Sequence, residues 1–243
     1  MNHQKSTFWR NRPITSLVIG MLFLITAVPA YAKYKPKNRK PASGYSGAGG
    51  SRSPDNGSIP LTLLAPKTFI GKTASLRPML AWYTPNSQNV EFRLFEFESA
   101  TRVKQIGEFK EIPTVVGINK LKLPSDYPEL TVGKTYLWQI SSDSAGGQII
   151  NRAEFTVINP TQSLTKKKFT TIPESVNYYA ENELWYEALE EALKVKSNGK
   201  LSQSGSTLVQ ELAESEMLTG SEAEINIIKR RIDNLEKISL SSQ

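Results

Sequence analysis

The chain has 243 residues, of which 39% are hydrophobic and 22% are charged, so it is long enough for one or two domains with buried cores. It has no cysteine, which excludes a disulfide framework and a lipid anchor on an N-terminal cysteine. The net charge of +7 arises in the N-terminal part, because residues 61–243 carry 21 basic and 22 acidic side chains. A near-neutral body lacks the accumulated basic contacts that a phosphate backbone requires, so we expect no nucleic-acid partner.

Residues 1–32 have the composition of a secretory signal peptide. A basic start precedes an apolar run from Leu17 to Val28, and small residues before the junction fit the A-x-A cleavage rule. We therefore predict cleavage between Ala32 and Lys33, followed by export to the periplasm or the extracellular space. The alternative is an N-terminal signal anchor in the inner membrane, because a stretch of 19 residues ending at Ala32 carries no charge.

Cleavage at this position would also remove His3, the one histidine of the chain. The mature chain would then lack histidine and cysteine, which are the commonest general base, the commonest metal ligand and the best thiol nucleophile. We therefore expect a protein that is not an enzyme, with no catalytic residues, no cofactor and no metal site.

Residues 33–59 are rich in Gly, Ser, Pro and Lys and have little apolar surface to bury, which predicts a flexible basic linker. A cluster of five basic side chains lies at its start, which favours contact with an envelope protein or with an anionic wall or membrane surface. These residues are Lys33, Lys35, Lys37, Arg39 and Lys40.

Residues 60–160 alternate between short β-rich runs and turn signals, with no helical pattern between them. This pattern predicts an antiparallel β-sandwich of the fibronectin type III or immunoglobulin-like kind. Leu80 and Trp82 fall on one strand face and are candidates for its core. The expected strands are Leu61–Leu64, Ser75–Tyr83, Val90–Glu98, Arg102–Phe109, Val115–Leu123, Lys134–Ser141 and Ile149–Ile158.

Two details of this region carry further expectations. Leu130, Gly133 and Tyr136 have the spacing of the tyrosine corner of fibronectin type III-like sandwiches, whose phenol hydroxyl bonds to an upstream backbone group. In the run from Val90, the apolar alternation changes parity after Leu94. Either a bulge shifts the strand there or both of its faces are covered, and we favour coverage of the outer face by the C-terminal helices.

A polar joint over residues 161–170 separates the strands from a small helical region over residues 171–240, which makes the fold class α+β. The first expected helix starts at the capping-box pair Thr171 and Glu174 and stops at Asn198-Gly199. The second covers Thr207 to Leu218. The third starts at Ser221 and carries an Ile/Leu seam, which either closes a bundle or mediates self-association with another chain.

Three segments, Pro60–Pro66, Arg77–Tyr83 and Tyr179–Leu189, resemble a secreted, mainly cyanobacterial family catalogued as domain of unknown function 928. The order of leader, basic Gly-rich segment, β-region and a helix with Trp-Tyr-Glu-Ala-Leu also matches. The absent cysteine and the additional helix from Ser221 onward depart from the family pattern. Because this family has no assigned activity, the resemblance implies an exported protein of cyanobacterial type.

The first expected helix contains the remaining candidates. Trp185 and Tyr186 point about 100° apart on a helix, so one of them is a candidate to face a partner, the alternative being that both pack on the sandwich. Because no histidine accompanies its glutamates, we interpret them as a solvated acidic face rather than a metal or acid/base site. They are Glu181, Glu183, Glu187, Glu190 and Glu191.

These patterns predict an exported, non-catalytic binding or structural module of the cell envelope. The alternative function is a carboxylate-based hydrolase that acts on an extracellular or wall polysaccharide, which would need two carboxyl groups about 5 to 9.5 Å apart across a cleft.

Overall fold

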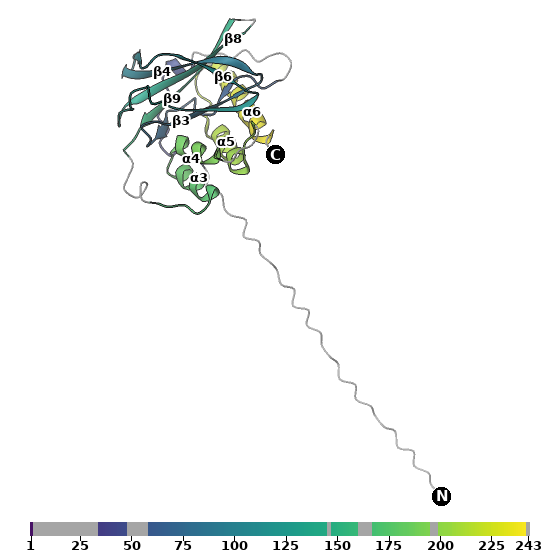
Figure 1. Cartoon of the computed structure of the whole chain (residues 1–243). Coiled ribbons are helices and arrows are strands. Elements are labelled where there is room, and N and C mark those ends of the chain that lie inside the picture. The colour runs from purple at the N-terminus through teal and green to yellow at the C-terminus, as the bar shows by residue number, and fades with distance from the viewer. Residues whose placement is uncertain (2–33, 48–57, 145–146, 160–166, 195–198, 242–243) are drawn as a thin grey trace. The chain divides into compact units, whose positions relative to one another are not determined.

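The computed structural model describes Met1 and residues 34–47, 58–144, 147–159, 167–194 and 199–241. Apart from Met1, the predicted leader and the cleavage position between Ala32 and Lys33 lie outside these residues. Figure 1 shows two layers of strands with helices α3, α4 and α5 gathered on one side of them. Among the described residues, no helix has the length and apolar character needed to cross a membrane.

The strands form two sheets. In the smaller sheet, β3 (Met79–Thr84) lies between β1 (Thr62–Leu63) and β7 (Gly117–Lys122), and all pairs are antiparallel. The larger sheet has the order β2-β9-β8-β4-β5, with β6 paired to a further part of β4. Its strands are β2 (Gly71–Thr73), β4 (Gln88–Ser99), β5 (Arg102–Gln105), β6 (Lys110–Thr114), β8 (Thr135–Ser144) and β9 (Gly147–Val157).

The core lies between these sheets, and both contribute large side chains to it. Leu80 and Trp82 of β3 are fully buried, as predicted, and they belong to the same cluster as Phe92, Trp138 and Phe155 of the larger sheet. The predicted α+β class, an antiparallel sandwich followed by helices, is confirmed. The alternation of apolar and polar residues is the local signal that made it predictable.

Strand β2 does not occur among the predicted strands. It is three residues long and pairs in parallel with β9, so it has no alternating pattern of its own. Its first residue, Gly71, lies against the ring of Tyr186, and a Cβ atom there would be only 3.1 Å from the Tyr186 Cε2 atom. Glycine therefore permits helix α4 to approach this edge of the sheet closely.

The predicted tyrosine corner is present. The Tyr136 hydroxyl accepts a hydrogen bond of 2.8 Å from the backbone N–H of Thr131, five residues upstream. The bond fixes the loop that leads into β8, which is the structural role expected of this motif.

The outer face of β4 differs from the expectation. Val90, Phe92 and Leu94 point into the core, and the register against β5 shifts only after Phe97. Phe97 lies on the outer face, where the ring of Tyr45 packs edge-on against it at 6.0 Å between centroids. An N-terminal segment therefore covers this part of the sheet, and the prediction that the C-terminal helices do so is wrong.

The first predicted helix is two helices, α3 (Ile172–Glu181) and α4 (Trp185–Ala192). Between them, Glu183 has a φ of 62°, in the left-handed region that interrupts a right-handed helix. The Thr171 hydroxyl accepts from the Glu174 N–H, as predicted, whereas the Glu174 carboxylate bonds to Thr170 rather than completing the box.

Two longer helices follow, α5 (Gln203–Ser215) and α6 (Glu222–Leu240). The predicted capping box of Ser221 and Glu224 is complete, so this helix start was readable from local sequence. In the predicted Ile/Leu seam, Leu235 and Ile238 are buried in the core, which is the bundle-closing alternative. Self-association through this helix stays a prediction.

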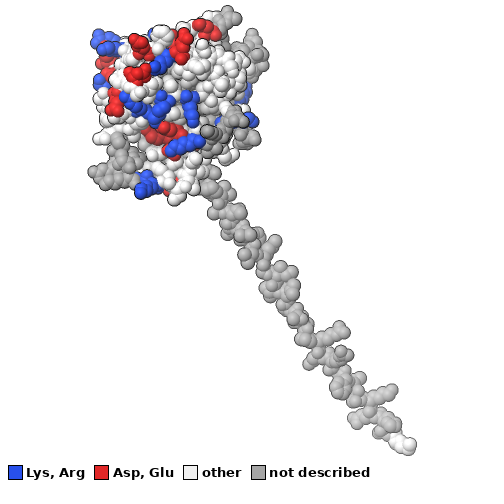
Figure 2. Space-filling view, viewed as in Figure 1, with Lys and Arg blue, Asp and Glu red and all other residues white. Residues whose placement is uncertain are grey.

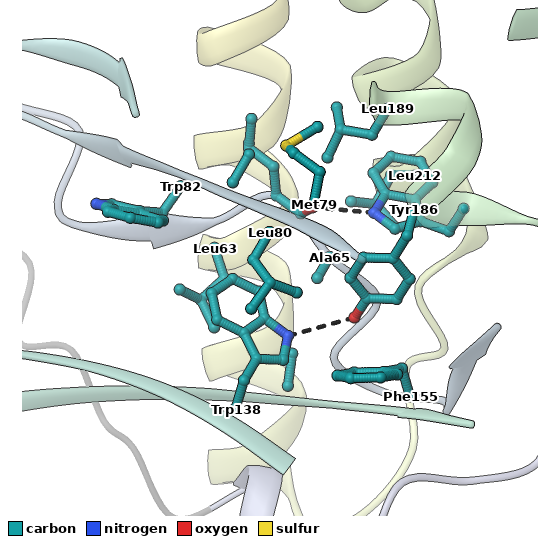
Figure 3. Close-up of a cluster of buried hydrophobic side chains, with 14 of the residues drawn as sticks. Leu63, Ala65, Met79, Leu80, Trp82, Trp138, Phe155, Tyr186, Leu189 and Leu212 are labelled. Carbon is teal, nitrogen blue, oxygen red and sulfur yellow. Dashed lines mark hydrogen bonds between the residues drawn. The ribbon is translucent and has the colours of Figure 1, made fainter. Parts of the chain in front are cut away.

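Trp185 and Tyr186 both lie in the core, with exposed fractions of 0% and 1%. The Trp185 indole N–H donates to the Leu64 carbonyl at 2.9 Å, and the Tyr186 hydroxyl accepts from the indole N–H of Trp138 at 3.3 Å. Figure 3 shows the Tyr186 ring directed between Trp138 and Phe155. The prediction of a partner-facing aromatic residue is therefore wrong, because α4 lies at the sandwich edge and buries two of its faces.

Candidate functional site

Residues 34–47, which we call the strap, are packed on the body of the molecule. The sequence predicted a flexible linker here, and for these residues that prediction is wrong. Tyr34 is only 1% exposed, and its ring lies against Trp185 with 5.0 Å between centroids. This aromatic side chain buries apolar surface and so helps to order a segment whose average composition is polar.

The first half of the strap, residues 34–39, is bound to the helices. The backbone N–H of Tyr34 donates to the Glu211 carboxylate at 2.8 Å, and the Ser215 hydroxyl donates to the Tyr34 carbonyl at 3.0 Å. The Arg39 guanidinium donates to the Ser215 carbonyl at 2.7 Å. Burial is the main reason why the pKa of the Tyr34 phenol is raised.

The second half of the strap, residues 40–47, meets the larger sheet. Residues 40–42 run antiparallel to residues 68–70, with Pro41 opposite Phe69 and two backbone hydrogen bonds of 2.9 and 3.2 Å. The strap therefore extends the sheet beyond β2, in the way that a peptide adds to an exposed edge.

Ser43 fastens the strap to a buried carboxylate. Its backbone N–H and its hydroxyl donate to Glu154 of β9, at 3.0 and 2.5 Å. Ser43 also precedes the single turn α1 (Gly44–Gly47), and its hydroxyl accepts from the Tyr45 N–H at 3.2 Å. A hydroxyl that donates to a carboxylate resembles an activated nucleophile. Here the same contacts cap a turn and hold the strap, which explains them in full.

Three adjoining concavities open along the second half of the strap. The first, of about 210 Å³, lies between the strap and the start of α6 and is lined by Ser43, Ser46, Lys67, Thr68 and Glu224, among others. The second, of about 270 Å³, includes Lys40, Ser43, Phe97, Ser99, Thr135 and Glu154. The third, of about 520 Å³, is wide open and is lined by Gly44, Tyr45, Ala100, Thr101 and Arg152.

Each concavity is lined by one basic residue. Burial, and next the charge of Arg231, lower the pKa of Lys67 in the first to about 8. In the second, the Lys40 side chain is exposed, and its ammonium makes no hydrogen bond or ion pair within the described residues. In the third, Arg152 donates to Gln139 at 2.8 Å. The chemistry available along the strap is therefore recognition of anionic or hydroxylated groups.

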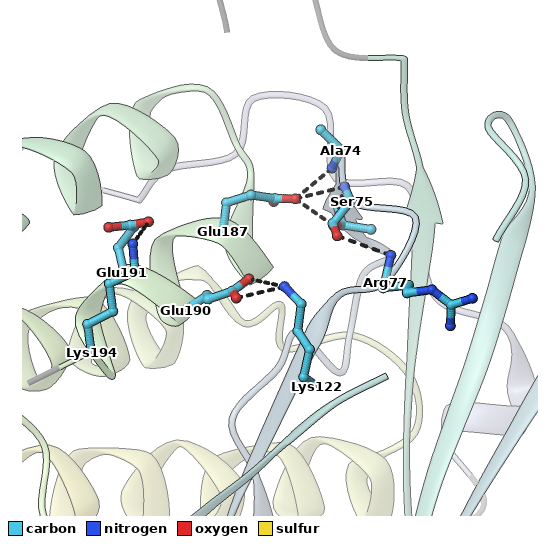
Figure 4. A network of polar contacts seen from close by, with 9 residues as sticks. Ala74, Ser75, Arg77, Lys122, Glu187, Glu190, Glu191 and Lys194 are labelled. Atoms are coloured by element: carbon cyan, nitrogen blue, oxygen red, sulfur yellow. Dashed lines mark hydrogen bonds and ion pairs between the residues drawn. The ribbon is translucent and has the colours of Figure 1, made fainter. Parts of the chain in front are cut away.

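The glutamates of the predicted first helix are not one solvated face, although Glu181 is exposed. Figure 4 shows Glu190 paired with Lys122 of β7, and Glu191 with Lys194, each at 2.6 Å. Outside that view, Glu183 pairs with Lys72 of β2 and accepts a hydrogen bond from the Lys37 N–H at 2.8 Å. Several of these carboxylates therefore join the helices to the strands and the strap. Periodicity did not reveal this role, because the partners are remote in sequence.

Glu187 is the most enclosed of these groups. One of its carboxylate oxygens accepts from the Thr73 hydroxyl and from the backbone N–H groups of Ala74 and Ser75, at 2.6 to 3.0 Å. The other is buried and has no hydrogen-bond partner in the described part of the chain. Burial raises the pKa of Glu187, and the hydrogen bonds oppose that shift. Among the described residues, no group of three or more His, Asp or Glu side chains is placed to hold a metal ion.

A family model described as Domain of Unknown Function (DUF928) matches residues 47–225. The chain belongs to this family. No curated protein matches it. The third fibronectin III domain of human KIAA0343 protein, a solution structure, is similar at 11% identity and a TM-score of 0.26, over 50% of this chain and 100% of that one. At this identity and TM-score, the likeness assigns no function to the chain.

The DUF928 match begins at Gly47, so nearly the whole strap lies before it. The strap nevertheless contributes Tyr34 to the core around Trp185, which lies within the match. A signal for this was present in the sequence, because Tyr34 and Tyr45 are the two large aromatic residues in an otherwise polar stretch. Their partners lie more than 50 residues away, so composition did not reveal the packing.

Proposed function

We propose that this DUF928 protein is an exported, non-catalytic binding module of the cell envelope, which binds an anionic envelope polymer along the strap. The observation that carries the proposal is the row of three adjoining concavities, each lined by one basic residue. Lys67 and Arg152 belong to the body, and Lys40 belongs to the strap that is bound to it, so all three extend from a fixed surface rather than from a mobile tail. Preorganised cations lose less entropy when they bind a ligand.

The surrounding charge supports local recognition rather than general attraction. Figure 2 shows basic and acidic side chains interleaved over the visible face of the body. This face therefore generates no broad positive field, and residues 61–243 as a whole carry 21 basic and 22 acidic side chains. An anionic polymer would thus be selected by specific contacts in the concavities.

The hydrolase alternative gains no support from these concavities. Hydrolysis by paired carboxylates needs two such groups across one cleft. The first concavity has Glu224, whose carboxylate caps Ser221, and the second has Glu154, which is bound to Ser43. Each of these two linings thus has one carboxylate, already engaged by the fold, and the lining of the third concavity has none. The hydrolase stays a sequence-based prediction.

Site-specific photo-crosslinking in cells tests the binding surface. A photoreactive residue in place of Ala100, which lines the second and third concavities, should yield a high-mass adduct that periodate oxidation degrades. The matched control is the same residue in place of Glu236, which is exposed on α6. A polymer partner would be contradicted by equal adducts at both positions or by no adduct at either. A discrete protein adduct at position 100 would also contradict it.

The intact mass of the protein tests export. We expect the mass of a chain that begins at Lys33, recovered from the periplasm or the medium. The full-length mass in a membrane fraction would instead favour the signal-anchor alternative.

A further inference from the structure

The second concavity has features that select one class of ligand. It lies between the strap and the outer face of the larger sheet, at the end of β4. Its volume of about 270 Å³ is below the range of about 300–1,000 Å³ typical of sites for drug-sized molecules, so it suits one small ring.

One lining group supplies a charge for the ligand. The Lys40 ammonium has no partner in the described residues, so it can pair with an anion without breaking an existing contact. The other charged group, Glu154, is 1% exposed and accepts its hydrogen bonds from Ser43. Its carboxylate holds the strap in place.

The remaining walls fit a hydroxylated ring. Ser99 and Thr135 supply hydroxyl groups. The Ser99 hydroxyl accepts from the Thr101 N–H at 3.4 Å, and the Thr135 hydroxyl lies 2.8 Å from that of Thr156, but a hydroxyl has one donor and two acceptor positions, so each keeps capacity for a ligand. Phe97 supplies an apolar aromatic wall, held by the edge-on ring of Tyr45. An ammonium, two hydroxyls and an aromatic face on one small cavity match a sugar ring that bears a carboxylate.

We propose that this concavity is a subsite for one acidic sugar unit of an anionic polysaccharide. Lys40 binds the carboxylate, Ser99 and Thr135 bind ring hydroxyls, and Phe97 contacts the apolar face of the ring. This inference deepens the proposed function and rests on it, because it names the chemistry of the polymer unit that the strap surface takes.

Calorimetric titration of the mature chain with trigalacturonate tests the subsite. Lys40→Gln should weaken binding by about tenfold or more, the range expected when a charge-assisted hydrogen bond is lost. Phe97→Leu, which keeps apolar bulk but removes the flat ring, should weaken it by several-fold. Neutral galactotriose should bind the unmodified chain at least about tenfold more weakly than trigalacturonate.

Lys104→Gln is the matched control. Lys104 of β5 lies opposite Glu96 of β4 in the strand register, and neighbouring residues of a strand point to opposite faces, so Lys104 projects from the face of the sheet opposite Phe97. It should leave the affinity unchanged, and thermal denaturation should show both lysine variants folded. Three results would each overturn the subsite. They are equal losses of affinity in Lys40→Gln and Lys104→Gln, equal binding of the neutral and the acidic trisaccharide, and no binding of trigalacturonate. A periodate-sensitive adduct at position 100 would still support the proposed function, so the two failures are distinguishable.

Discussion

The two halves of the strap have similar polar composition but meet different parts of the molecule. Residues 34–39 lie on the helices and begin with Tyr34, whose ring is fully buried. Residues 40–47 cross the edge and outer face of a sheet between open concavities. The first half therefore contributes mainly to the stability of the fold, whereas the second half, although Ser43 anchors it, also lines the concavities. The difference teaches that one buried aromatic side chain, rather than average composition, decides which role a polar segment takes.

The sharpest test of this contrast replaces one tyrosine in each half. Tyr34→Ala should lower the free energy of unfolding by about 3–5 kcal/mol, the range for a large aromatic residue removed from a core. The Tyr45 ring is only half-buried, so Tyr45→Ala should lower the free energy of unfolding by about 1 kcal/mol. Urea denaturation at pH 7 measures both values. Equal losses would contradict the division of the strap into a structural and a surface half.

A smaller effect is expected at the Ser43 anchor. Glu154→Ala removes the carboxylate that accepts from the Ser43 hydroxyl and the Ser43 N–H, and it leaves that N–H without a partner. It should lower the free energy of unfolding by about 2 kcal/mol. Ser43→Ala removes only the hydroxyl contact and should cost about 1 kcal/mol. Urea denaturation gives the two values. A larger loss in Ser43→Ala than in Glu154→Ala would show that Glu154 is not the anchor.

The smallest effect is a pH dependence at Glu187, which holds α4 on β2 and on the two residues that follow this strand. Burial raises its pKa in the folded state, so folding favours the protonated form. This group's contribution is therefore fully present below its unfolded value near 4.5 and falls as the pH rises through the raised folded value. Glu187→Gln cannot titrate, so its stability relative to the unmodified protein should increase with pH in that window. A difference that does not vary with pH would contradict the assignment.

The parts of the molecule that local sequence could predict are those built from local signals. Leu80 and Trp82 alternate along one strand, Tyr136 bonds within its own loop, and Ser221 caps its own helix. Each relation spans a few residues, so periodicity and spacing suffice to reveal it.

The parts that could not be predicted depend on remote partners. Strand β2 exists through parallel pairing with β9, and α4 separates from α3 where Glu183 takes a left-handed conformation and contacts Lys72. The concavities also arise only where the strap meets the sheet. None of the candidate residues chosen from sequence lines them except Lys40, which was chosen for its charge alone.

Amide hydrogen exchange along the strap tests the central claim most directly. The N–H groups of Tyr34, Ala42 and Ser43 each donate to an acceptor on the body, so their exchange should be slowed to rates approaching those of β8 and β9. Exchange of all three amides at the rate of an unstructured peptide would contradict the account, and would restore the flexible linker that composition predicts for residues 33–59.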